Sequence, residues 1–448
     1  MEIDFHYYAT FAAARLAGFD AKDAGTIAHA SQYVDDSSLE RLMDEGSYTG
    51  AEFGLGMTPQ FRITAFTPIP TVHTDAELLK LETAATWTTG DINEIRRVWS
   101  VFHFLPGNYV GNREVKDYRG SKSWDGLVFK YDDDAARDFK LMCLPNSVLV
   151  DEMINESREN FSTAHNRLHL AGIRMHILAD TWAHCYYAGT PDYWINDAGE
   201  RVSRIDPANG DRSEIKYYNA KWGGGGAEWS TPPSLFVRSV SYLGHGRMGH
   251  VPDYPWLKYE YVPRWSDRAI IKDNPEDYLK GFCQMVAALR SMRANKPFRA
   301  IDSYGVSDEI RNKIGGIIKS SGASDVATNA DGRARVWLES LAGLEIEGIR
   351  IGTPPVYDPD VWLRQAKANF NDGASDYYRF NLAARSHLDF VAARLKALAD
   401  IDIKAGNDGL VDDFKVVVKK VTHPTTLVVP VARRAFDFGK QVWRSVFP

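Results

Sequence analysis

Cysteine is scarce in this chain of 448 residues, which holds only Cys143, Cys185 and Cys283. Three scattered cysteines cannot build the disulfide framework of a small secreted domain, nor a zinc cluster held by thiolates. A reducing compartment is therefore the default expectation. Any metal ion has to be held by nitrogen and oxygen ligands.

Long apolar runs and an excess of positive charge are also missing. No stretch is apolar for long enough to cross a bilayer, and residues 1–6 lack the basic and apolar regions of a secretory signal. We therefore expect a cytoplasmic protein, with signal-independent export left open. The formal net charge of -6 argues against a strongly cationic nucleic-acid binder.

The residues that are present favour a mainly α fold with irregular loops and short β insertions. Hydrophobic residues make up 44% of the chain, as in ordinary globular proteins. A sheet core is not indicated, because the longer segments follow helical periodicity. Those segments are residues 5–34 with a break near Gly18, 75–101, 132–184 with an interruption near Pro145, 275–293 and 361–399.

Changes in composition divide the chain into three regions. Residues 1–300 are expected to form a helical metal-binding, catalytic domain with an aromatic-rich insertion near 190–265. Residues 301–410 form a helical extension. Residues 411–448 form a basic amphipathic tail, which either makes peripheral contact with an anionic membrane or docks on its own domain.

A stripe of histidine and aspartate is the strongest functional signal. In one proline-free segment, offsets of four, seven and eleven residues return to nearly the same helical face. Buried polar side chains need partners, and a divalent metal ion is one that suits imidazole and carboxylate together. We interpret His176, Asp180 and His184 as the centre of a metal site. His165 and His169 are weaker candidates, which either support the ligands from behind or are exposed to solvent. The stripe consists of His165, His169, His176, Asp180 and His184.

Other histidines and acids are candidates to complete the site. The segment 245–253 packs two imidazoles, an arginine and a carboxylate into a glycine-rich turn that can present side chains to a site. Each remaining candidate has a structural interpretation that is as good as the functional one. The candidates are Asp4, His6, His29, Asp35, Asp36, His103, His245, His250 and Asp253.

Two resemblances follow from these residues. Segments 3–7, 28–36, 176–189 and 244–250 resemble an uncharacterised bacterial family through roughly the first two-thirds of the chain. Segment 176–184, with the small-residue turn after it, resembles the signature helix of the zinc-dependent phospholipase C and S1/P1 nuclease superfamily. The fungal heterokaryon-incompatibility C-type proteins are similar to that superfamily. Its ligand order implies Asp4 with His6 or His29, Asp35 or Asp36, His103, His176, Asp180, His184, and His245 with His250 or Asp253.

One ligand of that superfamily is missing here. Its processed N-terminal tryptophan ligates metal through its own amine, and this chain has no such residue, so Asp4 is expected to take that place. The later ligands are also spaced differently. A centre of two ions is therefore a safer expectation than one of three.

The second resemblance implies a metal-dependent phosphodiester hydrolase, most similar to phospholipase C, with two or three zinc ions or else manganese or iron. Asp180 would bridge the ions, Asp36 or Asp4 would act as general base, and Arg247 would bind a phosphate oxygen. The expected partner is a phosphodiester substrate such as a phospholipid, since the chain has no strong nucleic-acid signature. A nuclease of the same superfamily and a non-catalytic scaffold with a structural metal remain the alternatives.

Overall fold

The computed structural model describes residues 1–38, 42–43, 65–66, 68–74, 89–108, 139–198, 201–215, 243–266, 268–303, 306–323, 327–368 and 374–403. Within them the fold is mainly α, as the periodicity predicts. The predicted tail at 411–448 lies outside the described residues. The α- and π-helical elements are η1 (Asp4–Ala9, one π-helical turn), α1 (Thr10–Leu16), α2 (Ala21–Asp36), α4 (Thr89–Phe102), α7 (Val148–Asn160), α8 (Arg167–Ala183), α9 (Tyr193–Asn196), α10 (Asn274–Ala294), α11 (Asp308–Ser320), α12 (Ala330–Leu341), α13 (Val361–Ala368) and α14 (Asp376–Ala399), and short 3₁₀ helices are η4 (Phe139–Leu141), η6 (Val251–Asp253) and η7 (Ala300–Asp302).

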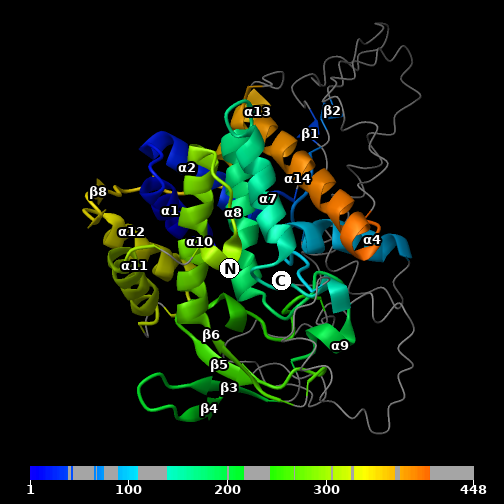
Figure 1. Ribbon diagram of the computed structural model, residues 1–448, viewed down its shortest axis with the longest axis vertical. Coiled ribbons are helices and arrows are strands. Elements are labelled where there is room, and N and C mark those ends of the chain that lie inside the picture. Colours follow the sequence, from blue (N-terminus) through cyan, green and yellow to red (C-terminus); the bar gives the residue numbers. More distant parts are fainter. Residues whose placement is uncertain are drawn as a thin grey trace, which may run out of the picture.

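Helix α8 lies at the centre of the helical layer, in contact with α2, α7, α10 and α14 (Figure 1). Every residue from His169 to Ala183 is buried, so the helix is covered on all sides. A helix in that position cannot send its polar side chains to solvent. Its histidines and its aspartate therefore have to find partners inside the protein.

The crossing of α2 and α8 depends on Gly172. A Cβ atom built at this residue would lie 2.3 Å from the carbonyl oxygen of Ile27 and 2.6 Å from the Cβ of Ala30. Only glycine allows two helix backbones to approach so closely. The C-terminal half of α2 is thereby held against α8, which brings Asp35 towards His176.

Capping residues mark the ends of the long helices. Asp20 begins α2 by accepting a hydrogen bond from the Asp23 backbone amide, as its position after the predicted break indicates. Asp273 caps α10 in the same way, and α10 ends at Asn295, whose φ of 50° is left-handed. These caps set where each helix stops, and so which side chains reach the shared core.

A four-stranded antiparallel sheet lies beyond one end of the helical layer (Figure 1). Its order is β4-β3-β5-β6, and the last strand leads directly into α10. The sheet accounts for part of the predicted insertion near 190–265 and extends past it. The strands are β3 (Val202–Ile205), β4 (Arg212–Glu214), β5 (Lys258–Tyr261) and β6 (Ile270–Asp273), and two separate pairs are β1 (Leu42–Met43) with β2 (Ala65–Phe66) and β7 (Glu345–Ile346) with β8 (Ile349–Arg350).

The helices after residue 300 pack directly on the earlier ones. Helix α14 contacts α8, and α12 contacts η1 at the start of the chain. The predicted extension therefore helps to enclose the N-terminal segment.

Among the described residues, no helix is both long enough and apolar enough to span a membrane.

Candidate metal centre

Asp180 is the central residue of a buried cluster of histidines and aspartates. Helix α8 carries it one turn after His176 and one turn before His184, which is the C-terminal cap of the helix. Its Oδ2 lies 3.1 Å from Nε2 of His176 and 3.6 Å from Nδ1 of His184. Its Oδ1 lies 3.2 Å from Nε2 of His6. The two oxygens of one carboxylate thus face different neighbours.

The first group of possible ligands joins three elements. His6 comes from η1, Asp35 from the end of α2 and His176 from α8, and one ligand atom of each lies within 4.8 Å of the others. The rings of His6 and His176 stack with centroids 3.7 Å apart. Asp35 approaches His6 at 4.0 Å and His176 at 3.8 Å. This group depends on the close crossing of α2 with α8.

The second group adds His103, which follows α4. Its Nδ1 lies 3.3 Å from Nε2 of His176 and 3.7 Å from Oδ2 of Asp180. His176 thus belongs to both the first and the second group. The two groups are therefore continuous.

The third group consists of His184, His245 and Asp253. Nε2 of His184 lies 3.3 Å from Oδ1 of Asp253, and Nε2 of His245 lies 3.5 Å from Oδ2 of the same carboxylate. The loop that carries His245 begins at Gly244, whose φ is +53°. A Cβ at Gly244 would lie 2.2 Å from the ring of Phe104, so both conformation and space require glycine there.

Three of the histidines fix their rings on backbone carbonyls. His103 uses Nε2 at 2.8 Å from the Thr71 oxygen, and His184 uses Nδ1 at 2.9 Å from the His103 oxygen. His245 uses Nδ1 at 2.8 Å from the Gly249 oxygen. A carbonyl accepts only from an N–H, so each of these ring nitrogens donates to its carbonyl. The other ring nitrogen of each residue faces the cluster, namely Nδ1 of His103, Nε2 of His184 and Nε2 of His245. Metal-ligating histidines are commonly oriented in this way.

The α-amino group of Met1 lies inside the same cluster. Its nitrogen is 3.0 Å from Oδ1 of Asp180, 3.1 Å from Oδ1 of Asp253 and 3.2 Å from Nε2 of His184. Burial works to lower the pKa of this amine, but the neighbouring carboxylates outweigh it and raise the pKa to about 11. The amine therefore occupies the part of the cluster where Asp4 was expected, and Asp4 is not among the residues of the three groups.

Burial and charge give the cluster an unusual protonation pattern. Burial opposes ionisation of Asp180, but His184, the Met1 amine, His176 and His6 together hold the pKa of Asp180 well below its ordinary value. Burial lowers the pKa of His6 and also that of His176. Neutral imidazoles beside ionised carboxylates are the forms that bind divalent cations.

The residues present fit a divalent metal centre. Oδ2 of Asp180 is buried and accepts no hydrogen bond from any described residue, although three histidines surround it. All the donor atoms are nitrogen or oxygen, as borderline divalent cations prefer. The first two groups share His176, and the contact of Asp180 with His184 joins them to the third. Together the groups comprise eight residues, namely His6, Asp35, His103, His176, Asp180, His184, His245 and Asp253.

Asp4, which was expected in the site, lies elsewhere. Its buried carboxylate faces α12, with Oδ2 at 3.2 Å from Nε of Arg333. Arg333 also pairs with Glu2 and donates to the Ala327 carbonyl oxygen at 2.7 Å. Asp4 therefore anchors the N-terminal segment to α12 and is not among the residues of the three groups.

His29 is also misplaced by the sequence interpretation. It lies on α2 nearly two turns before Asp35, and its ring packs 4.0 Å from that of Trp362 and 4.8 Å from that of Tyr357. Helical spacing gives the face of a residue but not its height along the axis. His29 thus belongs to an aromatic cluster.

The two weaker members of the α8 stripe are apart from the centre as well. His169 lies 3.1 Å from Oδ1 of Asp376 at the start of α14, and its ring packs on Trp362. His165 precedes the helix and is exposed. Both lie too far towards the N-terminal end of α8 to reach Asp180.

Asp35 belongs to the cluster, whereas its neighbour Asp36 lies beside it and is in none of the three groups. Consecutive helical residues differ by about 100° in direction, so only one of the two can face α8. Oδ2 of Asp36 accepts a hydrogen bond of 2.6 Å from the hydroxyl of Tyr357 and one of 3.4 Å from Gln32. Asp36 is therefore beside the centre but is not placed as a ligand.

Arg247 and His250 also depart from the expected roles. Arg247 is buried, with Nε 3.5 Å from Oδ1 of Asp197, so it is directed at a carboxylate of the protein. His250 is exposed and lies 3.1 Å from Oε1 of Glu2. Asp253, the alternative to His250, is the residue that completes the third group. Its 3₁₀ turn, Val251–Asp253, directs it inward.

The comparisons with known proteins give one result. The model of the family of unknown function DUF6765 matches residues 1–395. Neither a curated protein nor a solved structure matches the chain. The family match covers most of the sequence and includes every residue of the cluster. The chain therefore belongs to the DUF6765 family.

Proposed function

We propose that this protein is a phosphodiester hydrolase that depends on two or three divalent metal ions, zinc before manganese or iron. The observation that carries the proposal is the buried cluster of eight nitrogen and oxygen ligands centred on Asp180. A structural zinc site is saturated by four ligands. Eight residues and an amine in one continuous cluster exceed that need and suit a multinuclear catalytic centre.

Solvent access supports a catalytic role over a purely structural one. The side chain of Asp35 is 30% exposed and that of His245 is 18% exposed, whereas Asp180 is only 1% exposed. The cluster is thus buried at its middle and partly exposed at Asp35 and His245. Partial exposure of two candidate ligands is what the proposal requires, because a catalytic centre keeps positions for water or substrate.

Each part of the cluster has a distinct task in this proposal. Bound divalent cations supply Lewis-acid chemistry, since they acidify water and neutralise charge on the oxygens of a phosphodiester. Asp180 holds the centre together, because its two oxygens face different histidines. The backbone carbonyls of Thr71, His103 and Gly249 each hold one nitrogen of an imidazole, so that the other nitrogen is directed at the cluster.

Asp36 is the proposed proton acceptor. It follows the ligand Asp35 at the open side, and the hydroxyl of Tyr357 holds one of its oxygens. Burial raises the pKa of Asp36 above its ordinary value, which brings a carboxylate closer to the range useful for proton transfer. Its role remains the one expected from the sequence, although as a neighbour of the centre and not as a ligand.

The resemblance to the phospholipase C and S1/P1 nuclease superfamily supports a phosphodiester substrate, and we propose a phospholipid before a nucleic acid. That superfamily uses an N-terminal amine as a metal ligand, and here the Met1 amine lies beside Asp180 and Asp253. This likeness strengthens the resemblance. The mildly negative net charge gives nucleic-acid binding no assistance.

Metal content and turnover measured on the same preparations test the proposal. Protein purified without chelators is analysed by mass spectrometry for metal per chain, and then assayed with phosphatidylcholine vesicles and with single-stranded DNA. Asp180→Ala should lose both metal and turnover. Asp376→Ala is the matched control, because Asp376 also faces a histidine of α8 but lies outside the cluster.

Each outcome has a definite meaning. DNA cleavage without lipid cleavage would support the nuclease alternative. Bound metal that raises the melting temperature, with no turnover of either substrate, would support a structural role. A chain that stays free of metal after dialysis against zinc, manganese and iron would overturn the proposal.

A further inference from the structure

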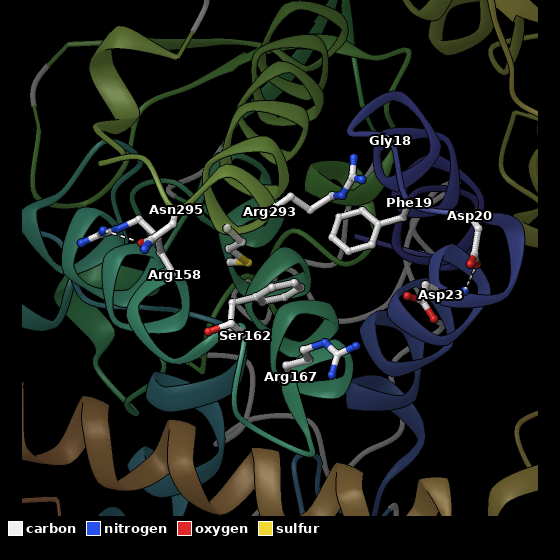
Figure 2. Close-up of a pocket in the computed structure, with 11 residues that line it drawn as sticks. Gly18, Phe19, Asp20, Asp23, Arg158, Ser162, Arg167, Arg293 and Asn295 are labelled. Carbon is white, nitrogen blue, oxygen red and sulfur yellow. Dashed lines mark hydrogen bonds between the residues drawn. The ribbon is translucent and has the colours of Figure 1, made fainter.

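A second site lies at the opposite end of α2 and α8 from the metal centre. A pocket of about 560 Å³ is formed where α2 and α8 begin and where α7 and α10 end (Figure 2). Arg167 is the first residue of α8, thirteen residues before Asp180, which places it about 20 Å from the centre along the helix. The volume is within the range of small-molecule sites.

Three arginines line this pocket, and two of them lie against aromatic rings. The guanidinium of Arg293 lies 5.3 Å from the ring centroid of Phe19, and that of Arg167 lies 6.0 Å from the ring centroid of Phe161. A guanidinium that stacks on a ring keeps its N–H groups directed outward in the plane. Such arginines are partly organised before a ligand arrives.

Arg167 and Arg293 are both exposed, and Arg293 donates one hydrogen bond of 2.8 Å to the carbonyl oxygen of Ala17. In the part of the chain that the structure describes, neither Arg167 nor Arg293 makes an ion pair, although Asp20 and Asp23 line the same pocket. Asp20 is occupied as the cap of α2. Arg158 differs from the other two arginines, because it pairs with Glu159 at 2.9 Å and donates to Asn295.

Figure 2 shows how these groups are arranged. Arg158 and Asn295 lie on one side of the pocket, and Asp20 and Asp23 lie on the other. Arg293 and Arg167 approach from two further sides, so that two guanidinium groups border one space. Phe19, Phe161 and Met292 also line the pocket and supply apolar surface.

We propose that this pocket binds a small oxyanion, a phosphate or carboxylate group, between Arg167 and Arg293. Planar guanidinium groups pair with such anions through two parallel hydrogen bonds. The apolar surface accepts a short hydrocarbon portion of the ligand. The carboxylate of Asp23 lines the same pocket and repels an anion, so a ligand of lower negative charge is favoured. The proposal rests on groups remote from the metal centre and does not depend on the proposed hydrolase activity.

Calorimetric titration of the purified protein with inorganic phosphate, and separately with succinate, tests this site. Phosphate that binds to metal ions would give a second binding transition. The dissociation constant of interest is that of the transition which the pocket variants weaken. Arg167→Met and Arg293→Met should each weaken that binding about tenfold, the loss expected for one set of charge-assisted hydrogen bonds. Asp23→Asn should strengthen it.

Arg335→Met is the matched control, because Arg335 is an exposed arginine of α12 outside the pocket and its loss changes the net charge equally. It should leave the binding unchanged. Response to phosphate alone supports a phosphate ligand, and response to both probes supports a wider class of oxyanions. Equal titration curves for the wild type, Arg167→Met and Arg293→Met would overturn the proposal, as would an equal loss in Arg335→Met.

Discussion

Arg333 and Asp4 form a buried ion pair that joins α12 to the start of the chain, with Nε of Arg333 3.2 Å from Oδ2 of Asp4. Neither side chain is exposed by more than 1%. The guanidinium also lies 5.3 Å from the ring of Tyr254, the residue after the candidate ligand Asp253. One arginine thus contacts the segment that carries His6 and the turn that carries Asp253.

Burial raises the pKa of Asp4 to about 8, so its carboxylate carries a full charge only above that pH. Replacing Arg333 by Met should therefore destabilise the fold by about 3–5 kcal/mol above pH 8, because it leaves this carboxylate buried without its partner, and by less at lower pH. Adding Asp4→Asn to that variant removes the charge and should restore part of the loss. Urea unfolding of the two single variants and the double variant measures this coupling. Strictly additive changes would show that the two side chains do not interact. Metal content should fall in Arg333→Met even where the protein remains folded.

Gly172→Ala should separate α2 from α8. The added methyl group would lie 2.3 Å from the Ile27 oxygen, so the helices must move apart, at a cost of about 1–3 kcal/mol for overpacking. Asp35 would then withdraw from His176, and bound metal per chain should decrease. Calorimetric melting and metal analysis of the same sample measure both effects.

Gly316→Ala provides the contrast for this prediction. Gly316 is exposed on α11, and an added Cβ there meets nothing within 4 Å. This substitution should stabilise the protein by about 0.5–1 kcal/mol through helix propensity, with no change in metal. If both alanine variants behave alike, the close crossing at Gly172 is not what positions Asp35.

An extension before Met1 should weaken metal binding. The α-amino group is enclosed by Asp180, Asp253 and His184, so a preceding peptide unit replaces a charged amine with a neutral amide and needs space in a buried site. Protein that carries two extra residues before Met1 should release metal to a chelator faster than protein without them. Equal release rates would show that the amine contributes nothing to the centre.

The sequence predicts the fold class and the middle of the site because both depend on local spacing. Helical periodicity indicates α8, and the four-residue spacing of His176, Asp180 and His184 places all three near one face. Asp20 as the cap of α2 follows from the same local reasoning. These features need no knowledge of how distant segments pack.

The outer parts of the site could not be derived in this way. His29 and His6 are both histidines of early helices, and only the packing of η1 and α2 on α8 decides which one reaches Asp180. Asp253 and His250 share one short loop, and its 3₁₀ turn selects the carboxylate. The Met1 amine could not be found from a pattern of residue types, because such a pattern describes side chains and the amine is a backbone group.

Acid should destabilise the protein partly through His387. This residue of α14 is fully buried, and its Nε2 donates to the Val101 carbonyl oxygen at 3.0 Å. Burial, with a smaller contribution from Arg174, lowers the pKa of His387 to about 3 in the folded protein. In the unfolded chain the pKa of a histidine is about 6.5. Between about pH 3 and pH 6.5 His387 is therefore protonated in the unfolded state and neutral in the folded state.

The stabilising effect of neutral His387 is complete above about pH 6.5 and is lost as the pH falls towards 3. Over that window the free energy of unfolding should fall by about 1.4 kcal/mol for each pH unit because of this residue. His387→Gln keeps an N–H for the Val101 oxygen but cannot titrate. Urea unfolding at several pH values should give a shallower acid dependence for the variant, by about one proton, whereas parallel curves would mean that His387 is protonated equally in both states.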